Sequence, residues 1–171
     1  MYYSKAAIRG HAIHPMLVAF PVAFYTATLA AFIVYAATAG VFWFQFAVVT
    51  NWAGVGFAIL AAVPGLIDWT AGIPKNTPAK RRGRQHLVLN LAAFVAFLIS
   101  ALIATARLGV VEPGAAWNIV LSAIGLGFTI PAGVLGWELV QKNHVGIELT
   151  PEQIRLEPKR EPPGEPIGHR A

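Results

Sequence analysis

The fold is decided by residues 15–38, which read PMLVAFPVAFYTATLAAFIVYAAT and contain no charged side chain. This run is part of a longer one, because no Asp, Glu, Lys or Arg occurs between Arg9 and Asp68. A water-soluble domain needs charged residues on its solvated faces, whereas a helix crossing a hydrocarbon core of about 30 Å needs roughly 20 apolar residues. Residues 15–38 are therefore predicted to span a membrane.

Three further stretches have the length and apolar character of membrane spans. They are residues 44–67, 86–107 and 117–140. The chain has 171 residues, of which 56% are hydrophobic, so we expect an all-α integral membrane protein, an up-down four-helix bundle. The helical domain would cover residues 15–147, after a short segment 1–14. The Pro-rich tail 148–171 is expected to be largely disordered beyond residue 157, with Thr150 capping one short helical turn.

Basic residues indicate how the bundle is oriented. Of the 13 Lys and Arg residues, all but Arg107 fall on one predicted side of the membrane. Because short loops rich in Lys and Arg stay in the cytoplasm, both termini and the middle loop are predicted to be cytoplasmic. The basic run 80–84 is explained by this orientation and by anionic lipid headgroups, so the expected partner is the lipid bilayer and not nucleic acid.

Composition excludes several classes of function. The chain has no cysteine, which removes disulfides, zinc–thiolate sites, iron–sulfur ligation and a thiol nucleophile. No charged residue lies at the predicted membrane centre, which argues against a channel or an ion-coupled transporter. No internal repeat is evident at this stage. The chain is also too short for a large soluble catalytic domain, so we expect a subunit that is not an enzyme by itself.

Candidate functional residues gather at the predicted cytoplasmic ends of the helices. Helices one and three lie on a diagonal in an up-down bundle, so the imidazoles of His14 and His86 could face each other. They could be the axial ligands of a haem b, or half of a transition-metal site completed by Asp68 or Glu138. Asn90, one turn after His86, could orient that imidazole.

A simpler interpretation of the same residues remains open. Histidines near a membrane surface are satisfied by water and headgroups. Asp68 could pair with Arg82 or Arg84, and Glu138 with Lys142 at i,i+4 spacing. The polar cluster would then only hold helix ends together, as in a non-catalytic membrane subunit or assembly factor.

Four short motifs carry a resemblance to a known family. They are HPMLVAFP (14–21), GLIDW (65–69), HLVLN (86–90) and GWELV (136–140). Over residues 10–147 the chain resembles the bacterial predicted membrane protein family known as domain of unknown function 2231. It departs from the family pattern at Ala19, where a histidine is common, and at Trp137, where a second glycine is usual.

The resemblance implies four helices and a bacterial inner membrane, with no established activity. Some relatives are joined to Rieske-type ferredoxin domains, which implies a redox context. We therefore expect a small haem- or metal-binding subunit of a membrane redox system, with another membrane or redox protein, or further copies of the chain, as partner. A cofactor-free scaffold is the alternative, and a small transporter component comes third.

Overall fold

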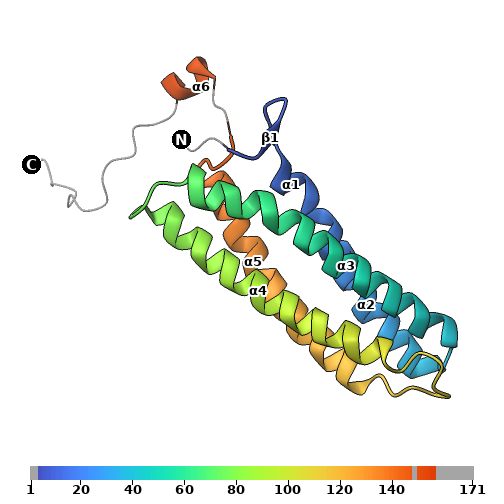
Figure 1. Cartoon of the computed structure of the whole chain (residues 1–171). Coiled ribbons are helices and arrows are strands. Elements are labelled where there is room, and N and C mark those ends of the chain that lie inside the picture. The colour runs from blue at the N-terminus through green and yellow to red at the C-terminus, as the bar shows by residue number, and fades with distance from the viewer. Residues whose placement is uncertain (1–3, 148–149, 157–171) are drawn as a thin grey trace, which may run out of the picture.

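The structure is a computed structural model that describes residues 4–147 and 150–156, so the expected disorder beyond residue 157 lies outside the described residues. Within them, four helical spans are long and apolar enough to cross a membrane, as predicted (Figure 1). The helices are α1 (Ile13–Leu17), α2 (Ala19–Thr38), α3 (Val41–Ile67), the π-helical turn η1 (Asp68–Gly72), α4 (Pro78–Thr105), α5 (Ala116–Gln141) and the short α6 (Pro151–Leu156).

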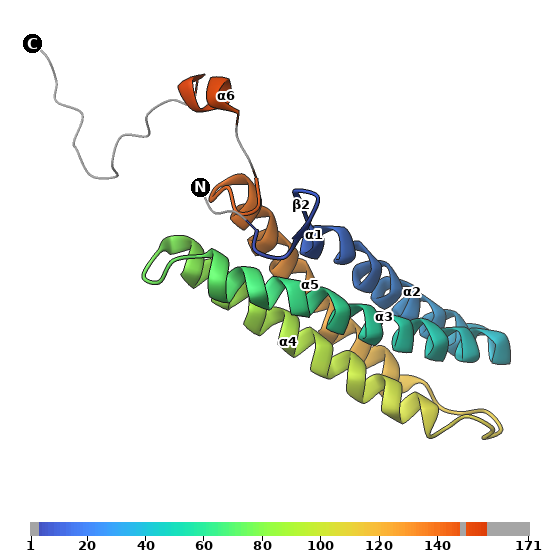
Figure 2. The same cartoon turned by 45° about the horizontal axis from the view of Figure 1, so that its top comes forward.

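The bundle consists of two helical hairpins side by side. In the first hairpin α2 packs along α3, and in the second α4 packs along α5; the contacts between the hairpins, α3 with α4 and α2 with α5, are much less extensive. Figures 1 and 2 show that α2, α3, α4 and α5 run in alternating directions along the bundle. This order places α2 and α4 on a diagonal, as the sequence predicted.

The helix boundaries follow from prolines and caps. The first span is interrupted at Val18, because Pro21 has no N–H to donate to the Leu17 carbonyl. The helix α4 begins at Pro78, two turns before the predicted start at His86. Thr77 caps it by accepting a hydrogen bond from the Lys80 N–H at 3.1 Å, with proline at the favoured first position.

Large apolar side chains cover the outside of the bundle, as expected for a surface that faces lipid. Val49 is 67% exposed and Ile130 is 70% exposed, whereas Thr28, Asn51, Ser100, Asn118 and Ser122 are fully buried. The hydroxyls of Thr28 and Thr50 lie 3.0 Å apart, and the amide of Asn118 donates to the Ser100 carbonyl at 2.7 Å. Small residues and buried polar residues therefore contribute to the interior beside aromatic rings such as Phe32 and Phe97, and small and polar contacts are usual for helices that associate in a bilayer.

Short elements extend from one end of the bundle, which we call the histidine end because His14 and His86 lie there. The strands β1 (Ala7–Ile8) and β2 (His11–Ala12) form a hairpin around Arg9 and Gly10, both at positive φ. In α6, the Gln153 N–H donates to the Thr150 hydroxyl and the Thr150 N–H donates to the Gln153 side chain, the predicted capping box.

Candidate functional site

Each of the two histidines is held by the partner helix of its own hairpin. Nδ1 of His14 lies 2.8 Å from the carbonyl oxygen of Ala61 on α3, and Nδ1 of His86 lies 2.8 Å from that of Ala132 on α5. A carbonyl oxygen can only accept, so both Nδ1 atoms carry the proton. In the neutral imidazole, Nε2 is then left with a free lone pair, the form that binds metals.

The two imidazole rings meet between the hairpins. Their centres are 6.1 Å apart and their planes are perpendicular. Two glycines make room for them, because a Cβ at Gly65 would lie 2.8 Å from Nδ1 of His14, and a Cβ at Gly136 would lie 3.1 Å from Cε1 of His86. The sequence therefore predicted correctly that His14 and His86 would face each other.

A second pair of rings repeats this arrangement three turns deeper in the bundle. Tyr25 and Phe97 stack across the hairpin interface with their centres 3.7 Å apart. Each ring again lies against a glycine of its own hairpin, since a Cβ at Gly54 would lie 2.7 Å from the Tyr25 ring and one at Gly125 would lie 2.5 Å from the Phe97 ring. The two hairpins thus use the same packing at two levels.

This correspondence is an internal repeat, so the expectation that the chain contains none is wrong. Residues 54–65 read GVGFAILAAVPG and residues 125–136 read GLGFTIPAGVLG, with seven of twelve positions identical. His86 and Phe97 follow His14 and Tyr25 by 72 positions, and the glycines correspond at an offset of 71. The repeat was overlooked because the first helices of the hairpins share few residues beyond the histidine. The hairpins have the same orientation, as in parallel repeats of membrane proteins.

Asn90 lies beside His86, as the sequence predicted, although its side chain is largely exposed. Its amide nitrogen lies 3.2 Å from Nε2 of His86 and donates to the His86 carbonyl at 2.8 Å. Nε2 of His14 receives no comparable hydrogen bond within the described residues. The two imidazoles are therefore alike on their Nδ1 side and different on their Nε2 side.

The carboxylate of Asp68 is occupied by the N-terminal segment. It accepts hydrogen bonds from the Ser4 hydroxyl at 2.9 Å, the Lys5 N–H at 2.6 Å and the Ala6 N–H at 3.0 Å. It forms no ion pair with Arg82 or Arg84, the partners considered in the simpler interpretation. Asp68 thus fastens residues 4–6 to the end of α3.

Glu138 is occupied by two cations. Its carboxylate lies 3.3 Å from Nε of Arg82 and 2.5 Å from Nζ of Lys142, the partner predicted by i,i+4 spacing. In the part of the chain that the structure describes, no group of three or more His, Asp or Glu side chains is arranged to hold a metal ion. The imidazoles that face each other at this end of the bundle are those of His14 and His86, with Asn90 beside His86.

The sequence that forms the helical hairpins and the site matches a known protein family. Residues 10–149 match the family described as predicted membrane protein (DUF2231). The chain belongs to this family. It is accordingly a multi-pass membrane protein that contacts the lipid bilayer. No curated protein and no solved structure matches it.

In the motif GLIDW (65–69), Gly65, Asp68 and Trp69 each make a different contact. Gly65 admits the His14 ring and Asp68 holds the N-terminal segment. Trp69 joins the end of α3 to the start of α4, because its Nε1–H donates to the Lys80 carbonyl at 3.1 Å and the Lys80 ammonium lies 4.4 Å above its ring. The Lys80 ammonium also donates to the Trp69 carbonyl.

Sequence reasoning missed the residues that support the imidazoles. The carbonyls of Ala61 and Ala132 carry no side-chain signal, but Gly65 and Gly136 do. Each glycine follows its carbonyl by four residues, which is one helical turn, and both belong to the repeated segment. Comparing the second helices of the two hairpins would have revealed them.

Proposed function

We propose that this protein is a small membrane redox subunit that holds one transition-metal centre between His14 and His86, as haem iron or as a single ion. The observation that carries the proposal is the pair of opposed rings 6.1 Å apart. Metal–imidazole bonds are about 2 Å long, so two imidazoles on opposite sides of one metal have ring centres roughly 6 Å apart.

The surroundings of the rings support this assignment. A hydrogen bond from Nδ1 to a backbone carbonyl orients a ligating imidazole and makes its Nε2 a stronger donor. Nitrogen donors without a carboxylate suit iron, copper, zinc or nickel better than magnesium or calcium. If Nε2 of His86 held a metal, Asn90 would lose its contact with that nitrogen and could keep its bond to the His86 carbonyl.

The position of the rings also supports a bound group. They lie at the interface between the hairpins, where helix packing is less extensive than within either hairpin. The site lies at the end that carries most of the basic residues, so we assign it to the cytoplasmic side of a bacterial inner membrane.

A structural role is the second candidate, and one observation favours it. Through the two Nδ1 bonds and the ring contact, the histidines connect all four membrane spans. In that case the pair braces the bundle without a cofactor, and the protein is a non-catalytic subunit or scaffold.

Purification of the full chain from membranes in mild detergent separates these functions. Visible spectra before and after reduction report haem, and elemental analysis reports a single ion. Two axial imidazoles give a low-spin haem with sharp bands that shift on reduction, whereas a single ion gives near-stoichiometric metal without them.

Four variants assign the signal to residues. His14→Ala and His86→Ala each abolish it, whereas His11→Ala retains it, because Nδ1 of His11 lies 3.0 Å from the Arg9 carbonyl in the β1–β2 hairpin, outside the facing pair of rings. Asp68→Asn also retains it, since that carboxylate is occupied by residues 4–6. A colourless, metal-free wild-type protein would falsify the redox proposal and leave the bracing role.

A further inference from the structure

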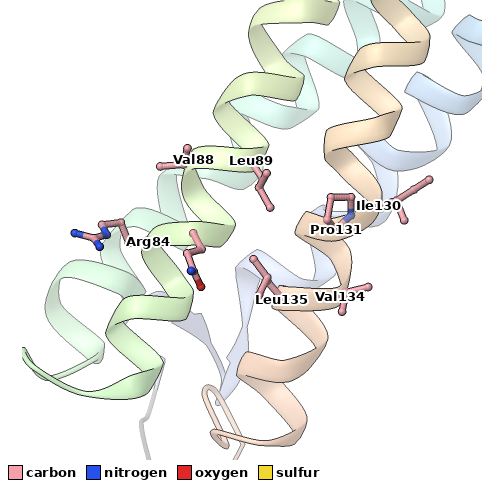
Figure 3. A pocket seen from close by; sticks show the side chains of 8 residues that line it. Arg84, Val88, Leu89, Ile130, Pro131, Val134 and Leu135 are labelled. Carbon is pink, nitrogen blue, oxygen red and sulfur yellow. The ribbon is translucent and has the colours of Figure 1, made fainter.

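The internal repeat produces two corresponding grooves on the outside of the bundle. The groove between α4 and α5, which we call the α4/α5 groove, has a volume of about 700 Å³. Its walls are apolar and include Val88, Leu89, Ile130 and Val134. In Figure 3, Leu89 and Leu135 point into the space between the two helices, whereas the Arg84 side chain extends from α4 on the side away from α5; Arg84 is nevertheless among the residues that line the groove.

The corresponding groove of the first hairpin is smaller, and the N-terminal segment forms part of its wall. It is lined by Leu60, Val63 and Pro64, the repeat counterparts of Pro131, Val134 and Leu135, and its volume is only about 280 Å³. Ala6 forms part of its lining, because Asp68 holds residues 4–6 over this surface. The counterpart of Asp68 in the second hairpin is Leu139, which cannot fasten a segment in this way.

The rim of the α4/α5 groove is positively charged. Arg84 and Arg81 are exposed, lie three residues apart on one face of α4, and form no ion pair within the described residues. Glu138 is already neutralised by Arg82 and Lys142. The counterpart of Arg84 in the first hairpin is Ala12, so the groove of the first hairpin lacks this cation.

We propose that the α4/α5 groove binds an acidic phospholipid. The acyl chain lies along Val88, Ile130 and Val134, and the phosphate lies at the guanidinium groups of Arg84 and Arg81. The groove opens onto the bilayer and its charged rim is at the histidine end of the spans, the depth at which headgroups lie. Long cationic side chains reach from an apolar wall to that level, and basic pockets between helices bind anionic headgroups.

The charge requirement is tested by native mass spectrometry of the full chain in detergent. Binding of phosphatidylglycerol is compared with that of phosphatidylcholine carrying the same acyl chains. Arg84→Gln lowers the affinity for phosphatidylglycerol about fivefold and leaves phosphatidylcholine unchanged, which is the effect of one cation near a membrane surface. Lys75→Gln removes the same charge from the exposed α3–α4 connection and leaves the preference intact. Equal effects of the two variants would reduce the preference to overall charge and overturn the site.

The groove itself is tested with a filling substitution. Val134→Trp occupies the α4/α5 groove and weakens the binding of both lipids, whereas Val95→Trp, on a lipid-exposed part of α4 outside the groove, does not. Unchanged lipid binding in Val134→Trp contradicts the proposal. The proposal is also contradicted if the wild-type chain is a dimer in the same spectra and Val134→Trp is a monomer, because a second copy of the chain would then occupy the groove. The metal or haem signal of the same variants is expected to be unaffected, so this result is independent of the redox proposal.

Discussion

Glycine determines how closely the histidine rings approach the helices beside them. A Cβ at Gly65 would lie 2.8 Å from Nδ1 of His14, whereas a Cβ at Gly56, on the same helix, would meet nothing within 4 Å. Alanine is a better helix former than glycine by about 0.5–1 kcal/mol, so its effect at an open position is favourable. Alanine substitutions at Gly65 and Gly56 therefore distinguish the effect of the ring contact on stability from the effect of helix propensity.

We expect Gly65→Ala and Gly56→Ala to change stability in opposite directions. Gly56→Ala raises the free energy of unfolding by about 0.5–1 kcal/mol. Gly65→Ala lowers it by about 1–3 kcal/mol, because the His14 ring must move out of a closely packed position. Thermal unfolding in detergent measures both. Similar shifts for the two variants would mean that His14 does not lie against α3.

Single residues differ in how far the sequence can predict them. The facing of His14 and His86 could be predicted, because the long apolar runs that follow them begin at the same level of two diagonal helices. The partners of Asp68 could not, because they are mainly backbone N–H groups more than 60 positions away, and any residue type supplies those. Its pairing with Arg82 or Arg84 looked equally reasonable from charge alone.

Three buried side-chain polar atoms have no hydrogen-bond partner within the described residues: the hydroxyls of Tyr25 and Ser122 and Oδ1 of Asn118. The hydroxyl of Tyr25 is buried and has no hydrogen-bond partner within the described residues, while its ring stacks on Phe97. The repeat places phenylalanine at the corresponding position of the second hairpin, so the ring alone meets the packing requirement. A buried hydroxyl without a partner costs about 1–3 kcal/mol.

Tyr25→Phe is therefore expected to stabilise the bundle. A gain of about 1 kcal/mol raises the Tm by about 2–4 °C in a chain of this size. Ser100→Ala is the control, because it removes a buried hydroxyl that accepts from the Asn118 amide at 3.1 Å, and it lowers the Tm. A lower Tm for Tyr25→Phe would show that the hydroxyl has a partner, such as an ordered water.

Helical elements could be predicted where hydropathy alone defines them. All four spans were found from apolar runs. The first two turns of α4 were not, because Lys80, Arg81 and Arg82 have helix-forming side chains but no apolar signal. The β1–β2 hairpin was missed as well, since two residues per strand are too few for an alternating pattern.

For the molecule as a whole, the orientation of the bundle is open to a direct test. Reporter fusions at Gly40 and Glu112 are expected to read as external, and a fusion at Asn76 as cytoplasmic, because the basic residues lie mainly at the histidine end. Gly40 and Glu112 lie in the connections at the opposite end of the bundle from Asn76. A cytoplasmic signal at Gly40 would reverse the orientation and place the two imidazoles on the outer side.

The repeated helical hairpins make this protein equivalent to a homodimer fused into one chain. In a true homodimer every mutation appears twice, so the two halves must change together. A repeat within one chain removes that constraint and lets each half change separately. Asn90 accordingly serves only His86, whose counterpart His14 has Val18 one turn later, and Asp68 serves only the first half. The two facing imidazoles can therefore differ in their surroundings, an asymmetry that a symmetric dimer could not possess.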